Sequence, residues 1–301
     1  MSVAATKESP AVETPFLRLA REFARSRTAL AGLAVLVLIV LAALFARWVV
    51  PQDPYDLAQL DILDSMMAPG TLGGGGWTYW LGTDDQGRDM LSAIVFGLRT
   101  SLLVGVVATL IALAVGVAVG LLAAYAGDRV DGLVMRLVDI QLSFPAILIA
   151  LILLALLGKG VDKVIVALAA VQWAYYARTI RGSALVERRK EYIEAAQCLA
   201  LPHRRIMMRH LLPNCLPPLI VVATVQVAHA IALEATLSFL GVGVPVTQPS
   251  LGMLIASGYQ YMLSGDYWIS LFPGLALLVT IVAINLVGDR LRDVLNPRLN
   301  H

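Results

Sequence analysis

Four side chains with metal-ligand chemistry lie close together in the sequence. They form a Cys-x4-His-x6-His-x4-Cys array made of Cys198, His203, His210 and Cys215. Zinc binds such thiolates and imidazoles, but its ligand pairs are usually separated by about two to four residues. Prolines also interrupt the segment, so the four side chains are not expected to converge. We therefore predict that this chain holds no metal.

Motifs for bond-making chemistry are missing elsewhere in the sequence. There is no phosphate-cradling GxxxxGK[ST], no HExxH and no Ser-His-Asp pattern on a soluble scaffold. The sequence therefore predicts a chain that is not an enzyme, with no catalytic residue and no cofactor of its own.

The elements that position the polar residues are strongly apolar. The chain has 301 residues, of which 58% are hydrophobic and 15% charged, whereas soluble domains carry about 25% charged residues. About 20 apolar residues cross a bilayer as a helix. Five long uncharged runs and one short one are candidates, at 29–46, 101–127, 140–158, 164–177, 216–233 and 267–288. Because the alternation of a membrane barrel is absent, we predict an all-α integral membrane protein with six transmembrane helices.

Basic residues are concentrated in three segments that six spans place on one side of the membrane. These are residues 1–27, the loop at about 178–215 and the tail 291–301, whereas the loop 51–100 is rich in aspartate. By the positive-inside rule, the basic side and both termini face the cytoplasm. Topology accounts for the charge, so no nucleic-acid partner is predicted. The remaining segments of the chain are a first transmembrane helix at 28–50 and a five-helix core at 101–290. Within the loop 51–100, the glycine run at 73–76 predicts a flexible connector.

Two further features of the spans have alternative interpretations. Gly116 and Gly120 predict close helix packing, with a glycine hinge for gating as the alternative. Gln226, His229 and Glu234 share one helical face, which predicts either polar contacts between helices or the lining of a translocation pathway. Because Glu234 is nearly alone among membrane carboxylates, a proton relay is poorly supported.

The segment EYIEAAQCLALPHRRIMMRHLLPN, residues 191–214, is a charged interruption between apolar runs. Apolar residues at helical spacing predict one short helix that ends at Pro202 and a second that Pro213 stops. Ala195 and Ala196 add little bulk, which predicts a bare surface for close docking of a partner. A solvated loop with an interfacial helix is the alternative.

The same segment resembles the EAA loop of bacterial binding-protein-dependent ATP-binding cassette (ABC) importer permeases. The resemblance rests on Glu194-Ala195-Ala196, the turn at Ala200, and His210-Leu-Leu-Pro213-Asn214. LGTDDQGRDMLSAIVFGLRTSLLVG (81–105), EATLSFLGVGV (234–244) and GDRLRDVLNPRL (288–299) are similar to the dipeptide/oligopeptide (DppC/OppC-like) subfamily. Glycine is usual in the family at the position of Ala200 and frequent at that of Arg290. These departures concern local geometry.

The resemblance implies a type I importer permease fold with an extra N-terminal span, in the bacterial inner membrane. It implies a heterodimer with a homologous second permease, two cytoplasmic ATPase subunits that bind ATP and Mg²⁺, and an extracytoplasmic solute-binding protein. It assigns ATPase coupling to Glu194, Ala195, Ala196, Ala200, His210 and Pro213. A second cytoplasmic contact is assigned to the connection that contains Asp128, Asp131 and Arg136.

Several functions remain open on the sequence alone. Di- and oligopeptides are the expected substrates, but glutathione, nickel complexes and opines use similar permeases. A proton-driven secondary transporter and a structural or signalling membrane protein are the alternatives from other classes.

Overall fold

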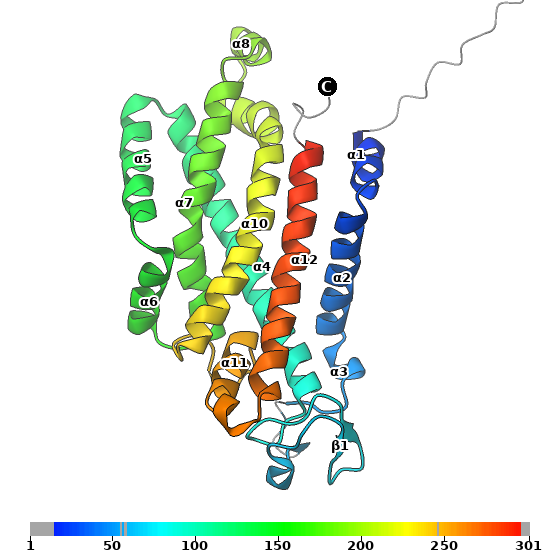
Figure 1. Cartoon of the computed structure of the whole chain (residues 1–301). Coiled ribbons are helices and arrows are strands. Elements are labelled where there is room, and N and C mark those ends of the chain that lie inside the picture. Colours follow the sequence, from blue (N-terminus) through cyan, green and yellow to red (C-terminus); the bar gives the residue numbers. More distant parts are fainter. Residues whose placement is uncertain (1–14, 55, 57–58, 246, 296–301) are drawn as a thin grey trace, which may run out of the picture.

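Long helices that run roughly side by side dominate the protein, with a small loop domain at one end (Figure 1). The computed structural model describes residues 15–54, 56, 59–245 and 247–295. In chain order the elements are α1 Pro15–Ala24, α2 Arg27–Leu44, α3 Ala46–Val49, η2 Ile62–Asp64, β1 Thr71–Leu72, β2 Thr78–Tyr79, α4 Met90–Tyr125, α5 Asp128–Ser143, α6 Ala146–Leu157, α7 Val161–Glu187, α8 Glu191–Cys198, α9 His203–Arg205, η3 Ile206–Leu211, α10 Leu212–Phe239, α11 Leu251–Tyr259, η4 Met262–Ser264 and α12 Trp268–Leu295.

The helical class is confirmed, and five of the six predicted spans have a counterpart among the described residues when the bent pair of helices counts as one. Within the described residues, four helices are long and apolar enough to cross a membrane: α2, α4, the continuous helix His203–Phe239, and α12. The bent pair of α5 and α6 makes a fifth. Helix α7, on the short run 164–177, is not among these candidates; it runs between the α5–α6 pair and α10 (Figure 1).

Helix α7 has other helices of the chain along much of its length. It packs against α4, α5, α6 and α10, and its fully buried residues include Val164, Leu168, Gln172, Tyr176 and Ile180. A polar side chain such as Gln172 is tolerated there because it finds hydrogen-bond partners on its neighbours. The uncharged run 164–177 is short, but the helix extends beyond it at both ends.

The predicted span 140–158 is not one straight helix. Helices α5 and α6 meet at a bend of 92°. Phe144 is extended, with φ −93° and ψ 143°, and Pro145 caps α6. Proline removes a backbone donor and disfavours a helical residue before it, so the apolar run breaks at this dipeptide.

The loop before α4 is a folded unit, and the prediction of a flexible glycine connector was wrong. Residues 73–76 close a hairpin between β1 and β2, in which Gly74 donates its N–H to the Asp64 carboxylate. The Tyr79 hydroxyl donates to the same carboxylate at 2.8 Å. Burial and Asp64 raise the pKa of Tyr79 to about 12. The phenol therefore stays a donor at neutral pH.

A buried ion pair marks the end of this loop. The Arg88 guanidinium and the Asp84 carboxylate are 2.7 Å apart and almost fully buried. Asp89 then caps α4 by accepting the N–H of Ser92. Helix α4 therefore begins at Met90, so the loop is shorter than the predicted 51–100.

Arg290, at a position where glycine is frequent, ties the N-terminal helix to the bundle. Its guanidinium donates to the backbone carbonyl of Glu22 at the end of α1, and α1 packs on α12. Basic groups are favourable at the C-terminal end of a helix, where the carbonyls lack partners. Helix α12 continues to Leu295, beyond residue 291, where the cytoplasmic tail was predicted to begin. Residues 1–14 and 296–301 lie outside the described part of the chain.

Glycines of α4 allow α7 to approach closely. A Cβ at Gly116 would lie 2.5 Å from the Trp173 carbonyl oxygen, and one at Gly120 would lie 2.3 Å from that of Ala177. These distances are shorter than any real Cβ contact. The packing interpretation of the two glycines therefore agrees with the structure.

Candidate functional site

The charged segment forms an elbow that projects beyond the bundle (Figure 1). We define the elbow as residues 188–211, which include α8, a turn, α9 and η3. Pro202 precedes α9, as predicted, but Pro213 does not stop the second limb. The six residues of η3 form a π-helix that leads directly into α10. Proline is tolerated in the first turn of a helix, and π-helical turns absorb irregular hydrogen bonding.

The turn of the elbow is a Schellman motif built on an alanine. The N–H of Leu201 donates to the Ala196 carbonyl at 3.2 Å, and that of Ala200 donates to Gln197 at 2.9 Å. This pattern requires a left-handed residue at the centre, and Ala200 has φ +52°. The family's usual glycine at this position is explained by the geometry, because only glycine adopts it without strain.

We expect Ala200→Gly to stabilise the elbow by about 1 kcal/mol, because it removes the cost of a left-handed alanine. Hydrogen exchange of residues 189–205 should slow by about fivefold in the assembled protein, since 1.4 kcal/mol corresponds to about tenfold. Ala195→Gly is the matched control: it is exposed within α8, so it should speed exchange by a similar factor. Faster exchange in Ala200→Gly would contradict the strained turn.

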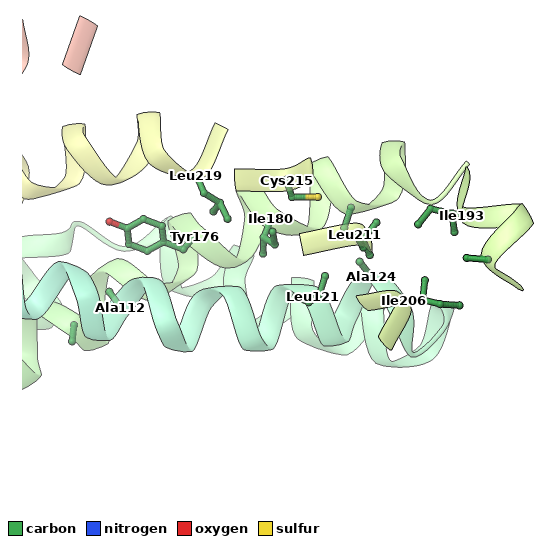
Figure 2. Packing of buried hydrophobic residues seen from close by; sticks show 13 residues of the cluster. Ala112, Leu121, Ala124, Tyr176, Ile180, Ile193, Ile206, Leu211, Cys215 and Leu219 are labelled. Carbon is green, nitrogen blue, oxygen red and sulfur yellow. The ribbon is translucent and has the colours of Figure 1, made fainter. Parts of the chain in front are cut away.

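An apolar core fastens the elbow to the bundle. Ile193, Ala196, Ile206 and Leu211 are all buried and belong to one cluster with Tyr176 and Ile180 of α7. Figure 2 shows Ile193, Ile206 and Leu211 turned toward the same interior. The predicted bare surface therefore applies to Ala195, which is exposed, and not to Ala196, whose small side chain lets α8 lie against its own chain.

Polar contacts fix the start of α8. The Glu187 carboxylate accepts from Tyr192 at 2.7 Å and from Lys190 at 2.6 Å. Burial and the neighbouring Glu187 raise the pKa of Tyr192 to about 12, so this hydroxyl remains a donor at neutral pH. Helix α8 is therefore presented at a defined angle.

The outer face of the elbow carries an acid beside a small residue. Glu194 and Ala195 are both exposed on α8. Downstream, Pro213 is exposed and His210 is half-buried, with its backbone carbonyl accepting from Asn214. A protruding helix with a carboxylate and little bulk is suited to insertion into a partner's cleft.

The predicted second contact is split by the structure. Asp128 and Arg136 are exposed on α5, but Asp131 accepts a two-pronged hydrogen bond from Arg181 of α7, with 2.8 Å from Nε to one oxygen. Fork-to-fork pairs of this kind hold geometry well. Asp131 therefore joins two helices of the same chain, and Asp128 and Arg136 remain available to a partner.

The polar face of α10 is also divided. Glu234 is fully buried and accepts from Ser101 of α4 at 2.8 Å and from Ser238 at 2.7 Å. The backbone carbonyl of Gln226 accepts from Gln172 of α7. Glu234 thus makes a polar contact between helices, which was one of its two interpretations. Gln226 takes part only through its backbone, and its buried side-chain Nε2 has no hydrogen-bond partner among the described residues. His229 is exposed and is the remaining candidate for a pathway lining.

Sequence reasoning missed the partners of these buried groups. Ser101 and Ser238, and Thr109, which donates to the Gln172 side chain at 3.3 Å, lie in apolar stretches. Nothing in their spacing distinguishes them from other small residues of a span. Four side chains of the Cys/His array also stay apart, since Cys198 is exposed on α8 and Cys215 is buried in α10. Among the described residues, no group of three or more His, Cys, Asp or Glu side chains is placed to hold a metal.

The fold and the elbow define a multi-pass helical membrane protein with a projecting elbow at one end. Comparison with known proteins then identifies it. Residues 116–301 match the family described as "Binding-protein-dependent transport system inner membrane component", and residues 14–69 match "N-terminal TM domain of oligopeptide transport permease C". The chain belongs to this family of transport permeases.

Individual relatives extend over almost the whole chain. The "Di/tripeptide transport system permease protein DppC" of Pseudomonas aeruginosa is 40% identical, over 96% of this chain and 94% of the relative. The "Dipeptide transport system permease protein DppC" of Escherichia coli K12 is 39% identical, over 97% and 96%. A solved structure titled "Inward facing conformations of the MetNI methionine ABC transporter" has a TM-score of 0.57 at 24% identity, and covers 69% of this chain and 98% of that one. The fold is that of a type I ABC importer permease.

Proposed function

We propose that this chain is one permease subunit of an ATP-driven importer that carries di- and oligopeptides across the bacterial inner membrane. The observation that carries the proposal is the 40% identity to a relative named as a di/tripeptide permease, along 96% of the chain. Glutathione, nickel complexes and opines remain the substrates to compare. In this proposal the chain itself performs no catalysis.

Three kinds of protein partner follow from this role. A homologous second permease completes the pathway, two cytoplasmic ATPase subunits bind ATP and Mg²⁺, and an extracytoplasmic binding protein delivers the substrate. The exposed Glu194 and Ala195 on α8 support docking of an ATPase at the elbow. Asp128 and Arg136 on α5 support a second contact at the same end of the bundle.

The orientation rests on charge. The elbow carries Arg188, Arg189, Lys190, Arg204, Arg205 and Arg209, whereas the folded loop at the opposite end carries Asp61, Asp64, Asp84, Asp85 and Asp89. Positively charged loops are retained on the cytoplasmic side. The elbow and both termini therefore face the cytoplasm in this proposal.

The test is reconstitution of the chain with its second permease, two ATPases and binding protein in proteoliposomes. We expect uptake of di- and tripeptides that requires ATP hydrolysis and stops with a non-hydrolysable ATP analogue. Glutathione, a nickel complex and an opine serve as competing substrates. Uptake by the chain alone, driven by a proton gradient without ATP, would overturn the proposal in favour of a secondary transporter.

A further inference from the structure

Tyr125, the last residue of α4, is contacted by two residues that enclose the tip of the elbow. Its hydroxyl is hydrogen-bonded to Nδ1 of His203, with 2.7 Å between the two atoms, and the two rings are 5.3 Å apart at 65°. The guanidinium carbon of Arg188 lies 5.0 Å from the centre of the Tyr125 ring. Cation–π attraction acts at such distances.

Arg188 makes a further contact with the end of the same helix. Its Nη1 donates to the backbone carbonyl of Ala124, which is in the last turn of α4. The carbonyls of a last helical turn lack partners and carry partial negative charge, so a guanidinium is favourable there. The end of α4 is thus held from the α7 side by a charge and from the α9 side by a hydrogen bond.

The positions of these residues in the chain show which elements the contacts connect. Arg188 follows α7 and His203 begins α9, so all of α8 lies between them. Tyr125 itself is separated from Asp128, where α5 begins, by only Ala126 and Gly127. One side chain therefore joins both limbs of the elbow to the connection that leads into the second predicted contact.

We propose that Tyr125, Arg188 and His203, which we call the Tyr125 clamp, are positioning residues that make the elbow and the start of α5 move as one unit. This inference rests on the proposed role of the elbow in coupling. When an ATPase moves α8, the clamp passes the displacement to the end of α4, and α4 carries it into the span. Without the clamp, α8 and α4 are joined only by the apolar base, so part of the displacement is lost between them.

The apolar base of the elbow does not depend on the polar contacts of the clamp, although the Tyr125 ring packs against its edge. Leu121, Ala124, Ile193 and Ile206 are buried in one cluster, whereas His203 is exposed and Tyr125 and Arg188 are half-buried. Removing the polar contacts leaves this cluster in place. The clamp therefore sets the direction of motion rather than the stability of the fold, and its loss should spare assembly.

The test compares Tyr125→Phe and Tyr125→Leu in the reconstituted complex. The readout is peptide transported per ATP hydrolysed, with co-purification of the ATPases as the check on assembly. Phenylalanine keeps the ring under Arg188 and loses the bond to His203, so the ratio should fall about threefold. Leucine loses both contacts, so the ratio should fall about tenfold. His203→Gln should behave as Tyr125→Phe does.

A distance measurement tests, independently of transport, whether the clamp holds α5 and α9 in a fixed arrangement. Spin labels attached at Arg129→Cys and Arg204→Cys, both exposed positions, report the distance between α5 and α9. The exposed Cys198 is replaced by serine, and Cys215 is buried, so neither native cysteine of this chain takes up label. We expect a narrow distance distribution with Tyr125 and a broad one with leucine. Tyr259→Leu is the matched control, because Tyr259 is exposed on α11 at the opposite end and should change neither readout.

The outcomes separate this inference from the proposed function. If Tyr125→Leu and His203→Gln keep the wild-type transport ratio and a narrow distribution, the clamp is overturned. If leucine prevents assembly, an unchanged ratio in Tyr125→Phe and His203→Gln overturns it equally. If disruption of Glu194 or Ala195 also leaves ATPase stimulation intact, the elbow is not the coupling element and the proposed coupling itself has failed.

Discussion

Glu194→Lys should abolish the stimulation of ATP hydrolysis by loaded binding protein, and peptide uptake with it. Glu194 is exposed on α8, so its carboxylate is free to pair with a cation in the ATPase cleft. Removing one partner of a desolvated charge pair costs about 2–5 kcal/mol, and lysine adds repulsion. The measurement is ATPase activity of the reconstituted complex, with and without loaded binding protein.

A bulky side chain beside the Glu194 carboxylate should block docking of the ATPase by a steric effect that does not depend on charge. Ala195→Trp places a large ring on the same exposed face and should also abolish stimulation while the elbow keeps its fold. Ala196→Trp differs, because Ala196 is buried against the cluster of Ile193 and Leu211. It should loosen α8 itself, which appears as rapid proteolysis between 189 and 202.

Two controls complete this comparison. Glu194→Gln keeps the shape of the side chain and should retain part of the stimulation. Asp162→Lys reverses an exposed charge at the opposite end of α7 and should leave stimulation unchanged. Normal stimulation in both Glu194→Lys and Ala195→Trp would mean that the elbow does not couple ATP hydrolysis to transport.

The spans were predictable because burying charge in lipid is costly, so membrane helices appear in the sequence as long uncharged runs. The uncharged runs mark the helices, although α4 begins at Met90 and α10 reaches Phe239, beyond the runs that predict them. Charged and polar residues continue a helix outside the bilayer without changing its geometry. Hydropathy therefore predicts where lipid is, and not where helices end.

The elbow was predictable in outline and not in detail. Apolar spacing and Pro202 predict two limbs, but the passage of the chain through Pro213 depends on the π-helix at η3. Six residues with a longer hydrogen-bond pattern have no signature in composition. The strained φ of Ala200 is likewise visible only once the Schellman hydrogen bonds are present.

The candidate site was the least predictable part because it depends on which neighbours a helix face meets. Helical spacing places Gln226, His229 and Glu234 on one arc, yet the arc spans two environments. Glu234 accepts a hydrogen bond from Ser101 of α4, whereas His229 is exposed. Pairings between distant residues decide such roles, and the Asp131–Arg181 pair is a second case.

Gly120→Ala should destabilise the complex by at least about 1–3 kcal/mol, the typical cost of overpacking. The added methyl would meet the backbone carbonyl of Ala177 at 2.3 Å and Cγ2 of Ile180 at 2.4 Å. A backbone atom cannot rotate away as a flexible side chain does, so α4 and α7 must separate. Because α7 is central to the bundle, the loss of packing spreads to α5 and α10.

Gly182→Ala is the matched control, because this glycine also lies within a helix, α7, but has no atom within 4 Å of an added Cβ. Alanine should stabilise there by about 1 kcal/mol, since glycine is the poorer helix former. Thermal unfolding of the purified complex should therefore move in opposite directions for the two variants. A glycine hinge predicts another pattern: in Gly120→Ala the midpoint would stay unchanged while transport is lost, because the hinge acts only when the helix bends. An unchanged midpoint with lost transport would thus indicate that Gly120 serves gating rather than packing. A lowered midpoint, with residual transport in proportion to folded complex, would establish that Gly120 serves the contact between α4 and α7.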